Sequence, residues 1–306
     1  MTGAGAVLGV DVGGTGTKAR LTDADGLVLD ETRVPTPRDD PTGLRLAVAV
    51  ADLAVRALEH ERHGVIGLDA IGLVTPGVVD EASGTVVIAV NLGWQDVPIR
   101  ELVGVELARR GIDVPIAFGH DVRAGALAEV AAGGPELSHG SVSFLPVGTG
   151  LASALVVDGQ VVPGGGWAGE IGQVLIRSGP HAGLRVEEIA SAGGVARRSG
   201  SASAHDAMLR VRDGDPTATA VWHDCVDVLA DACAWTAAVA GSHTIIVGGG
   251  LAESGPLLFD PLRTAVAERL VGVRTPEIVP AHHGDAAGAI GAGLLARRAL
   301  EAGVLL

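Results

Sequence analysis

Two stretches of the chain show the same order of apolar runs and glycine turns. In each, an apolar run leads through a glycine-rich turn into a second apolar run, and a polar turn containing glycine follows. The glycine-rich turns are Gly13-Gly14-Thr15 in the first stretch and Gly148-Thr149-Gly150 in the second. This order predicts strand, turn, strand, turn, strand twice, with the leading strands at 6–12 and 141–146.

Helical and strand periodicity divides the remaining chain into alternating elements. Helices are predicted at 41–63, 98–110, 121–132, 186–198, 202–211, 216–240, 256–270 and 284–302. Strands are predicted at 68–74, 114–118, 244–247 and 277–280, with a hairpin over 78–90. The alternation places the chain in the α/β class. We expect an N-terminal α/β lobe over 1–120, which a C-terminal helix at 290–306 rejoins, and a C-terminal α/β lobe over 121–289.

Composition narrows the class of partner. The formal charge of −14 argues against a nucleic-acid partner, because binding phosphate backbones requires clustered basic side chains. No apolar run reaches the ~18 residues that cross a bilayer, and the first residues lack the basic start of a signal peptide. We therefore expect a cytoplasmic protein with small-molecule ligands and no membrane partner. Cys225 and Cys233 lie in an apolar helical stretch and are expected to be buried core residues.

The glycine turns suggest a phosphate ligand. Glycine lets backbone N–H groups approach an anion closely, and threonine adds a hydroxyl donor, so two such hairpins facing each other would hold a polyphosphate group. Lys18 is the only lysine of the chain and lies beside the first turn. The P-loop motif is absent from the sequence, so this kind of nucleotide site is excluded.

Three further segments carry candidate chemistry. Asp121 stands between a strand and a helix, where it would act either as a helix cap or as a general base. Glu170 and Gln173 lie in a glycine-rich segment that is either a sugar-binding loop or a flexible surface loop. The triplet Gly248-Gly249-Gly250 after a short strand allows close approach to a nucleotide but is common at strand ends. Small residues at 286–293 suit close packing against backbone or a flat ligand.

Taken in order, these pieces resemble the ROK family (repressor, open reading frame, kinase), the sugar-kinase branch of the actin-like ATPase superfamily. The matching segments are 11–15, 75–80, 91–94, 120–129, 147–150, 168–173, 247–250 and 288–292. They cover nearly the whole chain in the family's order, and they look most like a bacterial glucokinase.

The resemblance implies a two-lobed actin-like, ribonuclease H-like fold that binds a nucleotide and a sugar between its lobes. It implies ATP and Mg²⁺ as cofactors, with Asp11 near the Mg²⁺, a homodimer, and Asp121 as the base that deprotonates a hexose hydroxyl, most simply O6 of glucose. The residues that it assigns to the nucleotide are Asp11, Gly13, Gly14, Thr15, Thr17, Lys18, Gly148, Thr149, Gly150, Gly248, Gly249 and Gly250. Those that it assigns to the sugar are Gly77, Asn91, His120, Glu170, Gln173 and Glu187.

Several positions depart from the family pattern. Gln173 replaces a common histidine that joins a run of cysteines to bind structural zinc, and the segment from there to Glu187 contains no cysteine. We therefore predict no zinc. His120 replaces the usual asparagine, which exchanges a neutral amide for a titratable ring. Gly16 stands where a lysine commonly follows Gly-Gly-Thr in the family. This variant also resembles polyphosphate-using glucokinases, so both ATP and polyphosphate stay open as the phosphoryl donor.

Other acceptors and other classes of protein stay open beside the glucokinase interpretation. The altered sugar loop is compatible with mannose, an N-acetylhexosamine or a sugar-like cyclitol as acceptor. A catalytically silent sugar sensor is a further alternative. The family's repressors carry a helix-turn-helix domain ahead of the first hairpin, and only about ten residues precede Asp11 here, so we expect an enzyme rather than a regulator.

Overall fold

A computed structural model describes residues 5–61 and 67–303 of the chain. These residues form two compact units, each with its own core. Unit 1 comprises Met1–Ala128, Pro163–Trp167 and Ala286–Leu306, and unit 2 comprises Glu129–Val162 and Ala168–Asp285.

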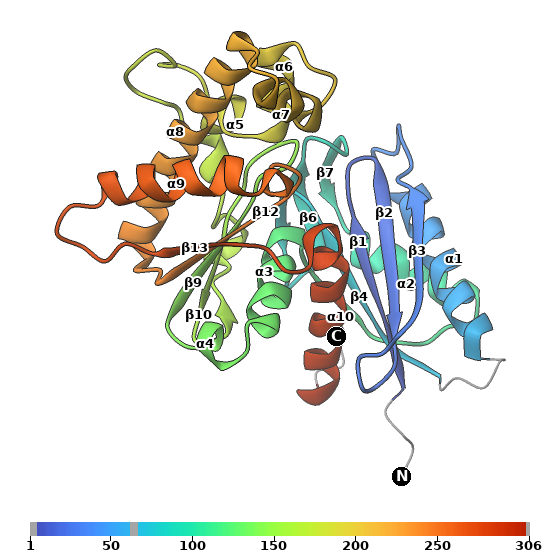
Figure 1. Ribbon diagram of the computed structural model, residues 1–306. Coiled ribbons are helices and arrows are strands. Elements are labelled where there is room, and N and C mark those ends of the chain that lie inside the picture. The colour runs from blue at the N-terminus through green and yellow to red at the C-terminus, as the bar shows by residue number, and fades with distance from the viewer. Residues whose placement is uncertain (1–4, 62–66, 304–306) are drawn as a thin grey trace. The chain divides into compact units, whose positions relative to one another are not determined.

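Unit 1 is built on a five-stranded sheet in the order β3-β2-β1-β4-β8 (Figure 1). Its strands are β1 (Ala6–Val12), β2 (Gly16–Thr22), β3 (Val28–Pro35), β4 (Leu68–Thr75) and β8 (Ile116–His120). The first three form an antiparallel meander, and β4 and β8 continue parallel to β1. A three-stranded antiparallel sheet follows β4, with strands β5 (Val78–Asp80), β6 (Thr85–Ala89) and β7 (Trp94–Val97).

Unit 2 repeats this topology. Its sheet runs β11-β10-β9-β12-β13, again with an antiparallel meander and two further strands parallel to the first. The strands are β9 (Ser141–Pro146), β10 (Ala154–Val157), β11 (Gln160–Val161), β12 (Thr244–Gly248) and β13 (Glu277–Pro280). The doubled strand, turn and strand pattern of the sequence therefore marks a duplicated sheet.

The helices of unit 1 are α1 (Leu44–Glu61), α2 (Ile99–Arg109) and α10 (Ala287–Glu301), and unit 1 also contains most of α3 (Asp121–Ala132). Those of unit 2 are α4 (Pro135–Ser138), α5 (Val186–Ile189), α6 (Ala192–Ser199), α7 (Ala204–Arg212), α8 (Pro216–Ala240) and α9 (Pro256–Arg269). Residues 62 and 63 of the predicted first helix lie outside the described residues.

The prediction of one helix over 186–198 is wrong. The chain forms two short helices, α5 and α6, because Ser191 ends the first and caps the second. Its backbone is extended, and its hydroxyl accepts a hydrogen bond from the Gly194 N–H at 2.9 Å. A serine at this position satisfies a backbone donor that has no partner within the helix.

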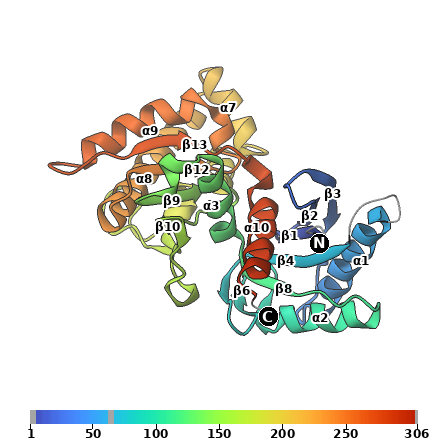
Figure 2. The same cartoon turned by 90° about the horizontal axis from the view of Figure 1, so that it is seen from below.

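Alternate residues of β1 face opposite layers of unit 1. Leu8 and Val10 pack into the core that includes α1 and α2, whereas Val7 packs with Ala296 of α10 on the other face. The sheet thus has α1 and α2 on one side and α10 on the other (Figure 2).

Helix α10 lies directly on the backbone of the sheet. A Cβ added at Gly72 of β4 would lie 1.8 Å from the carbonyl oxygen of Ala292, and one at Gly9 of β1 would lie 2.2 Å from that of Ala289. The small residues in the last helix therefore allow it to pack closely on the sheet. Of the two roles that the sequence left open for them, contact with backbone and contact with a flat ligand, the structure shows contact with backbone at these positions.

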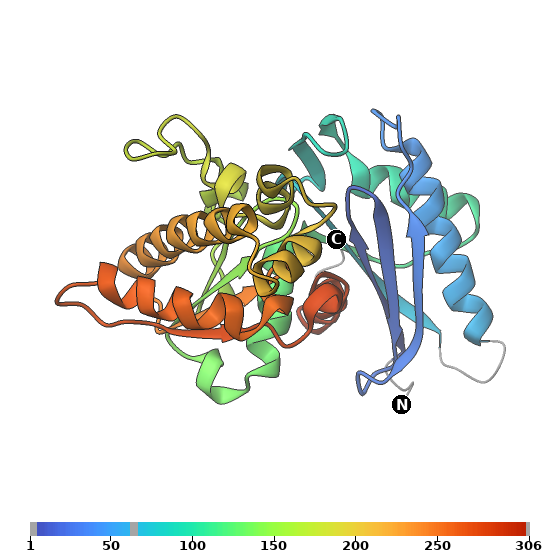
Figure 3. The same cartoon turned by 45° about the horizontal axis from the view of Figure 1, so that its top comes forward.

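The core of unit 2 is dominated by α8, which lies beside α9 (Figure 3). Helix α8 begins at Pro216 after the cap Asp215, whose carboxylate accepts two backbone N–H bonds, and it ends at Gly241 in the left-handed conformation. Cys225 and Cys233 are buried in this core as predicted, and burial raises the pKa of each thiol to about 12. Both are therefore unreactive as nucleophiles near neutral pH.

Among the helices of the described residues, none combines the length and the apolar composition that crossing a bilayer requires.

Candidate functional site

The first glycine turn joins β1 to β2 in unit 1. The Gly13 N–H donates to the Gly16 carbonyl at 3.0 Å, which leaves Gly14 and Thr15 exposed at the tip. Thr17 is buried, and its hydroxyl lies 3.0 Å from that of Thr36, which in turn donates to the Gly13 carbonyl at 2.7 Å. Thr17 thus holds the shape of the turn from beneath, whereas Gly14 and Thr15 present it to solvent.

Asp11 and Lys18 face each other across the hairpin below that turn. They are paired in the strand register, and Lys18 Nζ lies 3.7 Å from Asp11 Oδ2. A Cβ added at Gly288, in the first turn of α10, would lie 2.5 Å from the same carboxylate oxygen. The only lysine of the chain is therefore held beside a carboxylate at the end of β1, close to the start of a helix.

The described residues contain no group of three or more histidine, cysteine or acidic side chains placed to hold a metal ion. Mg²⁺ in phosphoryl-transfer sites is held by one or two carboxylates together with the phosphates of the substrate. The Asp11 carboxylate is 13% exposed and fits such a role, because it lies directly below the exposed tip formed by Gly14 and Thr15.

His120 ends β8, where it pairs with Thr75 of β4 in the parallel register. Its ring is buried, and Nδ1 accepts from the Arg123 N–H at 3.4 Å, which places the ring proton on Nε2. Burial first, and then the positive charge of Arg123, lower the pKa of His120 to about 3. The imidazole is therefore neutral and offers an N–H donor, as the side-chain amide of an asparagine would.

Asp121 begins α3 beside that donor, with Oδ1 3.5 Å from His120 Nε2. The Asp121 side chain is 25% exposed. Its Oδ1 accepts a hydrogen bond from the Val122 N–H at 2.7 Å. Burial raises the pKa of Asp121 to about 6, against the opposing effects of the Val122 N–H and of Arg123. Such a carboxylate is ionised at neutral pH yet basic enough to accept a proton.

Arg123 fixes the first turn of α3, and reasoning from the sequence did not single it out. It is buried; its Nε donates to Glu81 Oε1 at 3.1 Å and its Nη1 to the Gly166 carbonyl at 3.4 Å. A charged residue within the apolar stretch 122–128 was a signal that could have identified it, because buried arginines need partners.

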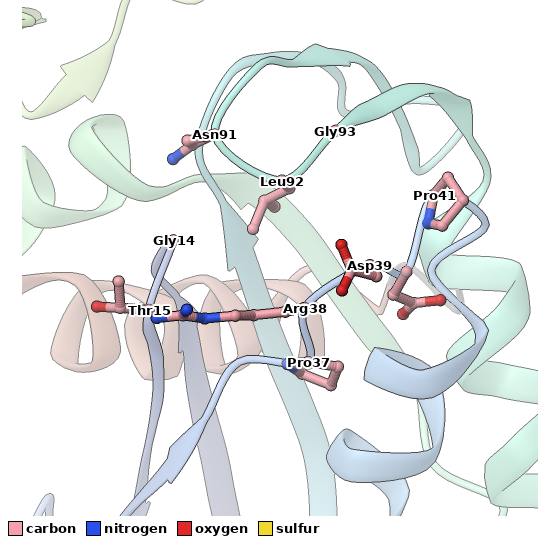
Figure 4. A pocket seen from close by; sticks show the side chains of 10 residues that line it. Gly14, Thr15, Pro37, Arg38, Asp39, Pro41, Asn91, Leu92 and Gly93 are labelled. Carbon is pink, nitrogen blue, oxygen red and sulfur yellow. The ribbon is translucent and has the colours of Figure 1, made fainter.

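Two further predicted sugar ligands lie in loops of the three-stranded sheet: Gly77 immediately before β5, and Asn91 between β6 and β7. Gly77 has φ +94°, and a Cβ there would lie 2.2 Å from the Ile88 carbonyl oxygen. The Asn91 side chain lies against the first glycine turn, since a Cβ at Gly14 would be 3.4 Å from Asn91 Nδ2. Asn91, Gly14 and Thr15 line a common pocket of about 720 Å³ (Figure 4).

In unit 2, the second glycine turn joins β9 to the strand that follows, and it rests on the glycine triplet. The Gly148 N–H donates to the Gly150 carbonyl at 3.0 Å, and the Val147 N–H donates to the Gly248 carbonyl at 2.8 Å. Gly249 has φ +76°, and a Cβ there would lie 2.6 Å from the Val147 carbonyl. Gly248 and Gly249 thus support the turn, whereas Thr149 and Gly250 are exposed.

Glu187 lies against the same turn. A Cβ added at Gly150 would lie 2.9 Å from Glu187 Oε2. The backbone at Glu187 is held by the Ser191 hydroxyl, which donates to its carbonyl at 2.6 Å, and the Ala192 N–H at the start of α6 donates to the Gly148 carbonyl at 2.8 Å. Ser191 is a second residue that the sequence reasoning missed, because a continuous helix was predicted across it.

Arg185 connects Gln173 to Glu187, and it too was missed. Its Nη1 donates to Gln173 Oε1 at 2.9 Å and lies 2.8 Å from Glu187 Oε1. Backbone pairing of Leu175 with Arg185 closes the intervening loop. Glu170 immediately precedes the short turn Ile171–Gln173. Unit 2 therefore holds the turn at 148–150 beside Glu187, and it ties Glu187 to Gln173.

Comparison with known proteins identifies the family of the chain. A sequence model of the ROK family matches residues 7–299. The chain is similar to a glucokinase of Streptomyces coelicolor, with 28% identity over 96% of this chain and 98% of the relative. It is also similar to an N-acetylmannosamine kinase of Escherichia fergusonii, with 30% identity over 95% of this chain and 98% of the relative.

Among solved structures, a ROK family glucokinase from Streptomyces griseus in complex with glucose and AMPPNP superposes with a TM-score of 0.77. It is 26% identical and covers 96% of this chain and 100% of its own. The actin-like fold predicted from the sequence is thereby confirmed. With a family match that spans nearly the whole chain, the protein belongs to the ROK family.

Proposed function

We propose that this carbohydrate kinase transfers the γ-phosphoryl group of ATP to the primary hydroxyl of a hexose, with glucose as the first candidate. The observation that carries the proposal is the Asp121 carboxylate, which burial gives a pKa of about 6 and which lies beside the neutral donor His120. The similarity to glucokinases over almost the full chain supports the acceptor class.

In the proposed reaction, Asp121 accepts the proton of the acceptor hydroxyl while that oxygen forms a bond to the γ-phosphorus. The bond from the γ-phosphorus to the bridging oxygen breaks, and ADP leaves. The Val122 N–H holds the carboxylate in place, with His120 Nε2 3.5 Å from the same oxygen. The backbone N–H groups of the two glycine turns would neutralise phosphate charge. Asp11 would hold a nucleotide-bound Mg²⁺, which supplies further charge neutralisation when present.

Gly77, Asn91, Glu170, Gln173 and Glu187 would orient the sugar hydroxyls through paired acceptors and donors. We propose no zinc ion in the loop from Gln173 to Glu187, which contains no cysteine. In its place, Arg185 links Gln173 to Glu187. The two side chains that would touch the sugar are therefore positioned by a charged hydrogen-bonding residue.

The decisive experiment measures ADP formation by the purified protein with Mg²⁺, ATP and a panel of glucose, mannose, N-acetylglucosamine, N-acetylmannosamine and a hydroxymethyl cyclitol. A parallel series replaces ATP with inorganic polyphosphate and measures the sugar phosphate. Glucose with ATP should give the highest kcat/KM. Transfer with none of the acceptors from either donor would contradict kinase activity, and calorimetric binding of sugar without transfer would favour a sensor.

N-acetylmannosamine is the second candidate acceptor. A kinase for this sugar is 30% identical over 95% of the chain. A kcat/KM for N-acetylmannosamine above that for glucose would establish this alternative.

The pH dependence of activity should follow Asp121. Because the base must be ionised, kcat/KM should be half-maximal near pH 6, level off about one pH unit above that midpoint and approach a tenfold fall per pH unit below it. Rates measured from about pH 5 to pH 8 test this. His120, whose pKa is about 3, does not titrate in that range, so a His120→Asn variant should keep the same midpoint. A profile that stays flat down to about pH 5, as the ordinary pKa of 3.8 would give, would contradict the effect of burial.

Removing the Arg185 side chain should weaken sugar binding. Its guanidinium is 44% exposed, so its contact with Glu187 is screened by solvent. We expect Arg185→Ala to raise KM for the sugar by about two- to fivefold, with kcat nearly unchanged. Arg177→Ala is the matched control, because Arg177 is an exposed arginine in the same loop. Equal KM values for the two variants would argue against a positioning role for Arg185.

A further inference from the structure

The loop that follows β3, residues 37–41, forms one wall of the 720 Å³ pocket. It is anchored from several sides. The Thr36 hydroxyl donates to the Gly13 carbonyl, the Arg45 Nη1 donates to the Arg38 carbonyl at 2.8 Å, and the Trp94 Nε1 donates to the Asp40 carbonyl at 2.7 Å. The Asp40 carboxylate is buried and accepts the Leu46 N–H at 2.9 Å. The backbone of the loop is therefore fixed.

This fixed loop presents two charged side chains, Arg38 and Asp39, to the pocket. Both are exposed, and neither side chain has an ion pair or hydrogen bond with another residue in the part of the chain that the structure describes. The Arg38 guanidinium points toward Thr15 of the first glycine turn, and the Asp39 carboxylate points into the same space (Figure 4).

Asp39 has φ +54°, a left-handed conformation that residues other than glycine adopt infrequently. Such a conformation persists only where the surrounding structure imposes it, and it recurs at ligand sites. At Asp39, the hydrogen bonds that anchor the loop impose the left-handed conformation, which directs the carboxylate into the pocket.

The chemistry of the lining indicates a neutral, polyhydroxylated ligand. Arg38, Asp39 and Asn91 offer donors and acceptors in planar pairs, and Leu92 and Pro37 add apolar surface. The exposed carboxylate of Asp39 disfavours a polyphosphate chain in this part of the pocket. Its volume of about 720 Å³ lies within the ~300–1,000 Å³ of pockets that bury drug-sized ligands, which are larger than one hexose.

We propose that this pocket is a subsite for a second sugar ring, glycosidically joined to the ring that is phosphorylated. The pocket adjoins the proposed sugar and phosphate sites, because Asn91 and Gly14 border the pocket and also belong to those sites. This subsite rests on the proposed function, because the first ring is the hexose that the kinase is proposed to phosphorylate. It makes the protein a kinase of disaccharide-sized acceptors as well as of free hexoses.

The test compares kcat/KM for glucose with that for maltose, cellobiose and trehalose. At least one disaccharide should exceed glucose by roughly five- to fiftyfold, the range of one or two hydrogen bonds from solvent-exposed side chains. Arg38→Ala and Asp39→Asn should each remove most of that gain and leave the value for glucose within about twofold of wild type. Asp96→Asn is the matched control, because Asp96 is an exposed aspartate with φ +52° that does not line the pocket.

A protein that phosphorylates glucose but shows no gain with any of the three disaccharides would overturn the subsite and leave the kinase function standing. So would variants that lower activity on glucose and disaccharide equally. If the protein transfers phosphate to no acceptor, calorimetric titration of the same disaccharides into wild type and Arg38→Ala still decides. Weaker binding by the variant supports the subsite, and equal or absent binding refutes it.

Discussion

Replacing Asp121 with asparagine should lower kcat by about 10²- to 10⁴-fold, the usual contribution of a general base. Asparagine has nearly the same shape, and its amide oxygen can still accept the Val122 N–H that Oδ1 accepts at 2.7 Å. The loss would therefore come from the missing basic oxygen and not from unfolding. Initial rates at saturating ATP and sugar measure it, with thermal unfolding of both proteins as the check on structure.

His120→Asn provides the matched comparison. His120 is a neutral donor 3.5 Å from Asp121, and asparagine offers a donor of the same kind. We expect this variant to keep kcat within about tenfold of wild type, since it replaces one uncharged donor 3.5 Å from the carboxylate by another. Full turnover by Asp121→Asn would remove this carboxylate from the mechanism, whether or not the protein proves to be a kinase.

The second large effect concerns stability. Gly72→Ala should destabilise the protein by about 3 kcal/mol, because its Cβ would lie 1.8 Å from the backbone oxygen of Ala292. Backbone cannot rotate away as a flexible side chain can, so α10 would have to move from β4. Urea denaturation measures the change as a lower midpoint with a similar slope.

Gly104→Ala, inside α2, makes the same chemical change without the clash. The nearest atom to its Cβ is Ile116 Cδ1 at 4.0 Å. Alanine should stabilise this helix position by about 0.5–1 kcal/mol. If Gly72→Ala unfolded at the same urea concentration as wild type, the close packing of α10 on β4 would be refuted. Loss of activity should accompany the loss of stability, because Gly288 of the same helix packs against Asp11.

The sequence predicted the elements whose signals are local. Helices α3 and α8 begin and end at the predicted residues, and the glycine turns marked both copies of the sheet. It failed where a long-range contact decides the local structure. The predicted helix 186–198 breaks at Ser191, where the chain is held to the distant second glycine turn: the Ser191 hydroxyl lies 3.2 Å from the Thr149 carbonyl oxygen, and the Ala192 N–H donates to the Gly148 carbonyl at 2.8 Å. Strand β7 exists only through pairing with β6.

The candidate site shows the same division. Asp121, the glycine turns and Glu187 could be named from motifs that lie together in the chain, although their roles stay predictions. Arg185 and Arg38 could not, because what makes each arginine relevant is the partner or pocket that folding places beside it. For Arg123 the sequence offered only a charge within an apolar stretch, and its partner Glu81 is known from the fold alone. Nor could the lowered pKa of His120 be predicted, since it follows from burial.

The position of α10 on β1 and β4 also has a consequence for biosynthesis. Unit 1 begins with the first strands of the chain, yet one face of its sheet is covered by a helix that follows the last strand of unit 2. During translation, that face of β1 and β4 therefore stays uncovered until α10 is synthesised, whereas all strands of unit 2 emerge before α10. Unit 2, although second in the sequence, should be the first to complete its fold, in contrast to the usual N-terminal-first order.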